Sequence, residues 1–150
     1  MPIPPFNPTG LLPAGIHPCT LAEIQSVFCK STRRTFLYGE MTRFLTVELP
    51  LLRAVGAVYV DGSFVRTKPD PDDVDLVIDI SNGSDPEFFE SFYKISTSHE
   101  AWKQSYSLDV WPYHPMLPKN LVSFFQYAGE KAAAELNINR KDPKGILRLT

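Results

Sequence analysis

The sequence predicts one α/β (α+β) domain, in which helices pack on a small mixed β-sheet. Two short segments, 57–60 and 73–80, have the composition and alternation of strands and are joined by a polar loop. A long helical pattern precedes them, and another strand and another helix follow. The 150 residues suit a single domain with its own core, so we expect one domain over residues 1–150.

Residues 1–19 are expected to form a proline-rich N-terminal arm. Six prolines and two glycines between residues 2 and 18 exclude a regular helix. The arm is nevertheless too apolar for a solvated tail, so we expect it to pack along the domain in an extended form. Its apolar residues are Ile3, Phe6, Leu11, Leu12 and Ile16.

Two helices should come next. Thr20 and Glu23 have the spacing of a capping box, which predicts a short helix that ends near Phe28. Apolar residues then recur at intervals of three and four over residues 33–55, a helical stripe that Pro50 should kink. The basic residues of this stripe either face an anionic ligand or form a solvated face, which is the commoner arrangement. They are Arg33, Arg34 and Arg43.

The strand at 73–80 carries the most informative pattern. One face is apolar, and the other holds Asp73 and Asp75 about 7 Å apart. Two carboxylates so close repel each other unless a cation neutralises them, which favours a divalent metal. At the end of the preceding strand, Gly62 allows close backbone approach and Ser63 offers an N–H and a hydroxyl to phosphate oxygens. A phosphate beside a metal indicates a nucleotide.

The second half should add a helix, a strand, a helix and a strand. Asp85 and Pro86 are expected to open a helix that ends near Lys94 and packs Phe88, Phe89 and Phe92 into the core, where aromatic residues at helical spacing usually lie. A strand over 107–112 sets Asp109 between apolar neighbours. A helix over 120–136 buries one face, and 144–149 is expected to close the sheet as an edge strand. The inward residues of that last helix are predicted to be Leu121, Phe124, Phe125, Ala128, Ala132 and Leu136.

Charge and composition narrow the function. The net charge is −2, but residues 61–90 hold nine acidic and two basic residues, so acid gathers around the proposed metal site. Cys19 and Cys29 lack metal-ligand spacing and are expected to be free thiols of a cytoplasmic protein. No apolar run reaches the length of a membrane span. The three histidines form no metal pattern, and only His114, near Asp109, is a candidate for the site.

The run Val60-Asp61-Gly62-Ser63, followed after nine intervening residues by Asp73-Val74-Asp75-Leu76, resembles the signature of the nucleotidyltransferase fold, typified by polymerase beta and the minimal nucleotidyltransferases. Asp61 stands where that signature usually has an apolar residue. The likeness covers the motif-bearing core at about 33–111. The start at 10–18 resembles that of small bacterial nucleotidyltransferase-like proteins, some of them associated with toxin–antitoxin or phage-defence systems.

The resemblance implies the roles of the site residues. Asp73 and Asp75 would bridge two Mg²⁺ or Mn²⁺ ions, and Asp109 would complete the metal site. Taken alone, Asp109 also fits a strand-end residue that caps the turn at Pro112. Gly62 and Ser63 would hold the phosphates of an NTP such as ATP, and Lys68 would add charge, although loop lysines are usually only solvated.

The activity that follows is Mg²⁺-dependent transfer of a nucleoside monophosphate from an NTP to a hydroxyl of RNA, such as tRNA, or of a partner protein. A toxin–antitoxin or phage-defence setting is implied by the same likeness. Two alternatives stay open. One is a non-catalytic antitoxin or regulatory subunit that keeps the fold and binds a partner protein, and the other is a nucleotide-binding protein without transfer.

Overall fold

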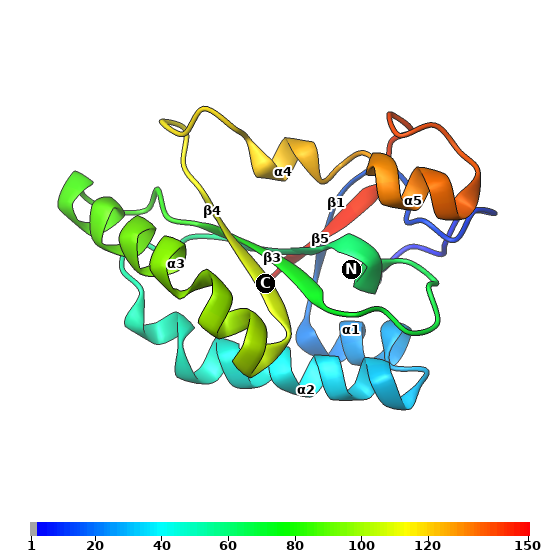
Figure 1. The fold of residues 1–150 in the computed structure, drawn as a ribbon, viewed down its shortest axis with the longest axis horizontal. Helices are drawn as coiled ribbons and strands as arrows, with labels where there is room; N and C mark the ends of the chain where they lie inside the picture. The colour runs from blue at the N-terminus through cyan, green and yellow to red at the C-terminus, as the bar shows by residue number, and fades with distance from the viewer. Residues whose placement is uncertain (1–2) are drawn as a thin grey trace.

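The computed structural model describes residues 3–150, which form a five-stranded mixed sheet in the order β1-β5-β2-β3-β4 (Figure 1). The strands are β1 (Gly15–Cys19), β2 (Val58–Asp61), β3 (Val74–Asp79), β4 (Leu108–Tyr113) and β5 (Gly145–Leu149). Strand β2 runs antiparallel to both of its neighbours, whereas β1 with β5 and β3 with β4 are parallel pairs. The predicted α/β class with a small mixed sheet is confirmed.

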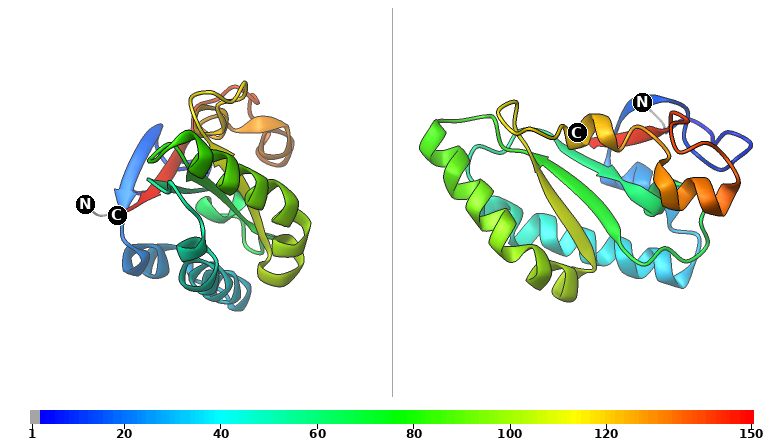
Figure 2. Two further views of the ribbon diagram at one scale, coloured as in Figure 1. Left: turned by 90° about the vertical axis from the view of Figure 1, so that its left-hand side faces the viewer. Right: turned by 45° about the horizontal axis from the view of Figure 1, so that its top comes forward.

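Helices cover both faces of this sheet. Three of them, α1 (Leu21–Phe28), α2 (Thr32–Val47) and α3 (Asp85–Tyr106), lie on one side, and α4 (Leu121–Phe124) and α5 (Gly129–Leu136) lie on the other (Figures 1 and 2). Two 3-10 turns, Leu49–Leu51 and Gly62–Val65, follow α2 and β2. Within residues 3–150, no helix combines the length and apolarity needed to cross a membrane.

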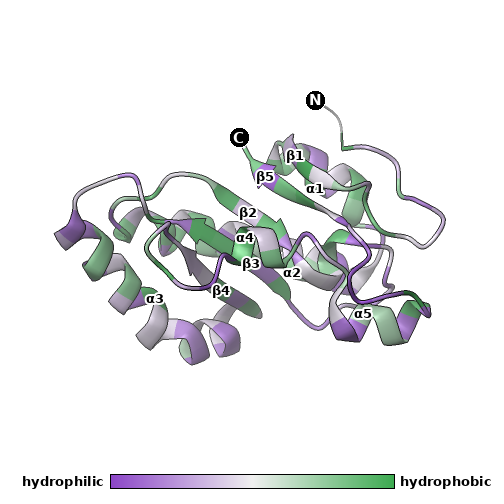
Figure 3. Ribbon diagram, turned by 90° about the horizontal axis from the view of Figure 1, so that it is seen from above, coloured by the Kyte–Doolittle hydropathy of each residue, from purple (hydrophilic) through white to green (hydrophobic). Residues whose placement is uncertain are grey.

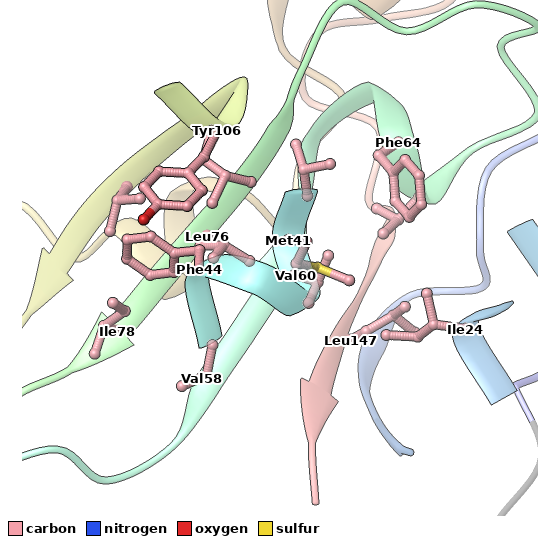
Figure 4. Packing of buried hydrophobic residues seen from close by; sticks show 14 of the residues in the cluster. Ile24, Met41, Phe44, Val58, Val60, Phe64, Leu76, Ile78, Tyr106 and Leu147 are labelled. Atoms are coloured by element: carbon pink, nitrogen blue, oxygen red, sulfur yellow. The ribbon is translucent and has the colours of Figure 1, made fainter. Parts of the chain in front are cut away.

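The core is divided by the sheet into a large and a small cluster. The large cluster packs the sheet against α1, α2 and α3, with Met41, Phe44, Val60 and Leu76 fully buried (Figure 4). The small cluster on the opposite face is centred on Val77, with Val122 and Ile146. In Figure 3 the strands are mostly apolar, while α3 and α5 also carry polar stretches. Strand alternation therefore assigns each β3 side chain to one of the two faces of the sheet.

The first two helices follow the prediction at their starts. The Thr20 hydroxyl accepts a hydrogen bond from the Glu23 N–H at 3.2 Å, so α1 begins and ends as expected. The second helix ends at Val47, earlier than the predicted stripe, and the chain then tightens into the turn that contains Pro50. Pro50 lacks an N–H and its ring clashes with the preceding turn of a helix, which explains this early end.

Helix α3 is longer than predicted. It continues past Lys94 to Tyr106, because no breaker intervenes and its buried face continues with Ile95 and Trp102. The N-cap is Ser84, and not Asp85 as expected, since the Ser84 hydroxyl accepts from the Glu87 N–H. The expected burial of Phe89 was also wrong: its side chain is 60% exposed.

The expected helix over 120–136 is interrupted, and this prediction was wrong. It divides into α4 and α5, because Gly129 has a φ of +81° and Tyr127 forms an isolated bridge with Pro143. Phe124, which was expected inward, is 51% exposed. Phe124 and Tyr127 of this segment are exposed to solvent, whereas Phe125 packs against the small core cluster.

The structures of the two ends of the chain both differ from the prediction, because the two ends pair with each other. The proline-rich arm supplies β1, an edge strand that accommodates Pro18, and β1 pairs with β5. Strand β5 is therefore central and not an edge, and both Ile146 and Leu147 are fully buried on its two faces. Pairing between residues about 130 positions apart leaves no local signal in the sequence.

Candidate functional site

Three aspartates lie in a row across the centre of the sheet. Asp61 on β2 is paired in register with Asp75 on β3, and Asp75 with Asp109 on β4. All three occupy the sheet face that α4 and α5 cover, since their neighbours in sequence belong to the opposite core. The sequence analysis predicted two members of this row and did not assign Asp61 to the site.

Lys103 joins two of the predicted site residues. Its ammonium donates to Asp73 Oδ2 at 2.8 Å and to Asp109 Oδ2 at 2.7 Å. Asp73 immediately precedes β3, and Lys103 lies in the last turn of α3, one short turn before β4. Sequence analysis missed Lys103 because only the packing of α3 beside β4 brings it to the carboxylates.

A cleft of about 270 Å³ brings the predicted site residues together. Gly62, Ser63, Asp73, Asp75 and Asp109 all line it. The remaining walls come from the basic side chains and from the α4–α5 segment: Arg66, Phe124, Phe125, Tyr127, Ala128, Gly129, Lys131, Ala132 and Lys144. Lys68, the sixth predicted residue, is not among the lining residues.

Crowded carboxylates give the row unusual electrostatics. Burial and then the charges of Asp73 and Asp109 raise the pKa of Asp75 to about 7. Burial and the Asp75 charge also raise the pKa of Asp61 well above its ordinary value, and within residues 3–150 neither Asp61 carboxyl oxygen has a hydrogen-bond partner. Burial lowers the pKa of the nearby Lys144 ammonium, although the two acids oppose this. A cation beside the row would relieve this repulsion.

Burial alone would lower the pKa of the Lys103 ammonium. Its hydrogen bonds to Asp109 and Asp73 outweigh that effect and raise the pKa above that of free lysine. Lys103 is therefore a cation at every physiological pH. Its side chain is 41% exposed, so it has a path to solvent.

A glycine is required at position 62 because the turn after β2 approaches β3 closely. Its φ is +80°, and a Cβ at this position would collide with the Asp75 carboxylate. The turn after β2 thus presses backbone directly against the central member of the aspartate row.

Gly62→Ala is expected to destabilise the protein by about 2–3 kcal/mol, because left-handed strain adds to the collision with Asp75. Urea unfolding measures the change. Gly39→Ala is the matched control: it lies within α2 with nothing near its Cβ position, so it should stabilise by about 0.5–1 kcal/mol. Equal effects at both positions would contradict the proposed crowding at Gly62.

Arg34 holds the loop between the two motif halves. Its guanidinium is 5% exposed and donates to the carbonyls of Phe64 at 2.6 Å and Lys68 at 2.6 Å, as well as to that of Arg66. The prediction of a solvated side chain was therefore wrong for Arg34. Arg33 likewise donates to a loop carbonyl, at Pro71. Arg43 is exposed and pairs with Glu40, as a solvated charge would.

Lys68 and Arg66 tie the same loop to α5. Both donate to the Glu135 carboxylate, Lys68 at 3.0 Å. The hydrogen bonds from Arg66 and then Lys68 lower the pKa of Glu135 to about 2. Lys68 thus acts in the structure as a clamp on α5, which closes one wall of the cleft.

Glu135→Gln is expected to lower stability at neutral pH. Because the folded-state pKa lies below the ordinary value of 4.5, the stabilisation is present above pH 4.5 and is lost as the pH falls towards 2. Thermal unfolding of both proteins from pH 7 to pH 2 should show the difference disappear in that window. Glu130→Gln, on the same helix with an 85% exposed carboxylate, is the control and should have little effect at any pH.

The histidine prediction was wrong in its choice of residue. His99, which was set aside, places Nε2 at 3.5 Å from Asp109 Oδ1, and its ring packs 4.6 Å from that of Trp111. His114, the expected candidate, packs instead against Phe88. The difference arises because α3 runs antiparallel to β4 beside it and returns residue 99 to the strand.

The donor set has the chemistry of a Mg²⁺ site, since hard divalent cations prefer carboxylate oxygens. Across residues 3–150, however, no three His, Cys, Asp or Glu side chains surround one point in a metal-binding arrangement. Lys103 occupies the position between Asp73 and Asp109. The residues therefore fit a metal only if the Lys103 ammonium moves away.

Comparison with known proteins identifies a family. Residues 4–150 match the model of a family of unknown function, DUF6932. The chain matches no curated protein and no solved structure. Because the family model spans nearly the whole sequence, the chain belongs to the DUF6932 family.

Proposed function

We propose that this protein is a divalent-metal-dependent nucleotidyltransferase that moves a nucleoside monophosphate from an NTP to an acceptor hydroxyl. One observation carries the proposal: Ser63, Asp73, Asp75 and Asp109 line a single cleft. These residues come from three segments up to 46 positions apart in the sequence, and the fold brings them together.

Each residue has a role in this chemistry. Asp73, Asp75 and Asp109 would hold the metal, which when bound supplies charge neutralisation and lowers the pKa of the acceptor hydroxyl. Gly62 and Ser63 would bring backbone against the triphosphate, and Lys131, whose side chain is 65% exposed on the cleft wall, would contact its charge. The acceptor oxygen forms a bond to the α-phosphorus, the bond to the β-phosphate oxygen breaks, pyrophosphate leaves, and the hydroxyl proton passes to Asp109.

Transfer is tested by incubating the purified protein with the four radiolabelled NTPs, Mg²⁺ and either total RNA or a cell lysate. Label should appear on an acceptor, and Asp73→Ala should abolish it. Mg²⁺ chelation should have the same effect. Absence of label on RNA and on protein, with each of the four NTPs, would refute the proposal.

The non-catalytic alternative is supported by one specific feature, the Lys103 ammonium that already neutralises Asp73 and Asp109. A protein that kept the fold only to bind a partner would need no metal there. In that case Asp73→Ala and Asp75→Ala would leave its biological effect intact, and a stable partner protein would co-purify with it. Loss of the effect in both variants would exclude this alternative.

A further inference from the structure

Two exposed aromatic side chains lie on the wall of the cleft that holds the aspartates. Phe124 is 51% exposed and Tyr127 is 48% exposed, and both also line the cleft. Their backbone is held in place: Ala128 N–H donates to Asp142 O at 2.9 Å and Gly129 N–H to Arg140 O at 2.9 Å. The rings are therefore presented to solvent by a fixed segment.

A second and larger hollow adjoins this cleft. It measures about 690 Å³ and is lined by Phe124, Tyr127, Gly129, Glu130, Arg140 and Lys141. Phe124, Tyr127 and Gly129 form walls of both hollows. A ligand that fills the outer hollow would therefore lie next to the cleft that holds the aspartates.

Several cationic side chains lie in or beside the outer hollow. The Lys119 ammonium lies 4.2 Å from the centre of the Phe124 ring. Arg140 and Lys141 line the hollow and are both exposed, and the Arg140 guanidinium lies 3.4 Å from the Glu130 carboxylate. Lys131, whose side chain is 65% exposed, lines the neighbouring inner cleft. Only Glu130 among the lining residues carries the opposite charge. The surface thus combines stacking rings with a net positive charge, whereas the inner cleft holds three aspartates together with three basic side chains.

We propose that this surface binds single-stranded RNA and delivers its terminal hydroxyl to the aspartate row. Exposed aromatic rings stack with unpaired bases, while lysine and arginine side chains contact phosphates. A duplex keeps its bases stacked internally and cannot offer them to Phe124 and Tyr127. The inference deepens the proposed function, on which it rests, by selecting RNA as the acceptor over a partner protein.

The test uses a short, unstructured, fluorescein-labelled RNA and fluorescence anisotropy with the full chain. Phe124→Ala and Tyr127→Ala should each weaken binding about tenfold, because each removes one stacking partner. Lys141→Gln should reduce the slope of log affinity against log salt by about one, as expected for a lost phosphate contact. The same RNA annealed to its complement should bind more weakly than the single strand.

Matched controls come from α3, which lies at the other side of the molecule in Figure 1. Phe89→Ala and Tyr93→Ala remove aromatic rings that are 60% and 71% exposed and should leave RNA binding unchanged. Circular dichroism verifies that each variant folds. Unchanged RNA affinity in Phe124→Ala and Tyr127→Ala, or loss of NTP binding alone, would overturn the inference.

The outcomes separate this inference from the proposed function. Asp75→Asn should still bind the RNA, because its side chain lies in the inner cleft. Binding through the rings without transfer would refute the enzymatic function but support the RNA surface. Transfer to RNA that is unchanged in Phe124→Ala and Tyr127→Ala would support the enzymatic function but refute the RNA surface.

Discussion

Asp75→Asn is expected to abolish nucleotidyl transfer while it stabilises the metal-free protein. Asp75 is half-buried at the centre of the row, where desolvation and the neighbouring carboxylates raise its pKa to about 7, so its charge at neutral pH opposes folding. Asparagine keeps the shape and removes the charge. Stability should rise by about 1–2 kcal/mol in urea unfolding with EDTA. Transfer should fall at least about a hundredfold, because changes beside metal ligands already cost 10- to 100-fold.

Asp79→Asn provides the control for this prediction. Asp79 lies on the same strand and the same face, four residues away, but its carboxylate accepts a hydrogen bond from the Ser81 N–H at 2.8 Å. Asparagine keeps an acceptor oxygen but loses the charge that strengthens this bond, so stability should fall slightly and transfer should be unchanged. If Asp75→Asn instead destabilised the protein as Asp79→Asn does, Asp75 would be a structural carboxylate, and the assignment of the row to catalysis would fail.

Lys103→Met is expected to tighten Mn²⁺ binding about tenfold. In the wild-type protein a metal must break the ion pairs of Lys103 with Asp73 and Asp109, and pairs of this exposure contribute up to about 1 kcal/mol each. We take the two ion pairs together to contribute about 1.4 kcal/mol. Removing this competition should raise the affinity for Mn²⁺ by a factor of about ten. Electron paramagnetic resonance of free Mn²⁺ measures the affinity directly, without any requirement for transfer.

The metal-free Lys103→Met protein should also be less stable, because Asp73 and Asp109 then repel each other without a counter-ion. Mg²⁺ should therefore raise the melting temperature of the variant more than that of the wild type. Lys131→Met is the control: this lysine lines the same cleft but lies 4.0 Å from its acidic neighbour Asp72. Mn²⁺ affinity that falls in Lys103→Met would show that the lysine assists metal binding and does not compete with it.

The local parts of the site were predictable from the sequence. Alternation along β3 assigns Asp73 and Asp75 to one face, and the same alternation around Asp109 assigns it to a strand face. Gly62 marks a turn that other residues do not tolerate. Each of these inferences depends only on neighbours within a few positions, and backbone geometry relates such neighbours in a regular way.

The counter-charges were not predictable in the same way. Lys103 and Lys144 enter the site from elements that carry no motif, and Lys68, the expected cation, is bound to Glu135 instead. The sequence around a lysine can be the same whether its side chain is solvated on a helix or lies beside a carboxylate in a site. Only the packing of α3 beside β4 distinguishes the two for Lys103.

The sequence by itself determined the class of fold, the faces of β3 and β4, and the three predicted carboxylates that line the cleft, because strand period and turn geometry are local properties. The tertiary structure alone decided that β1 and β5 pair, that Asp61 joins the row, and that Phe124 and Tyr127 stand exposed beside it. These arrangements depend on contacts between distant segments, whose free energies are set by packing and burial and have no period that a sequence can display.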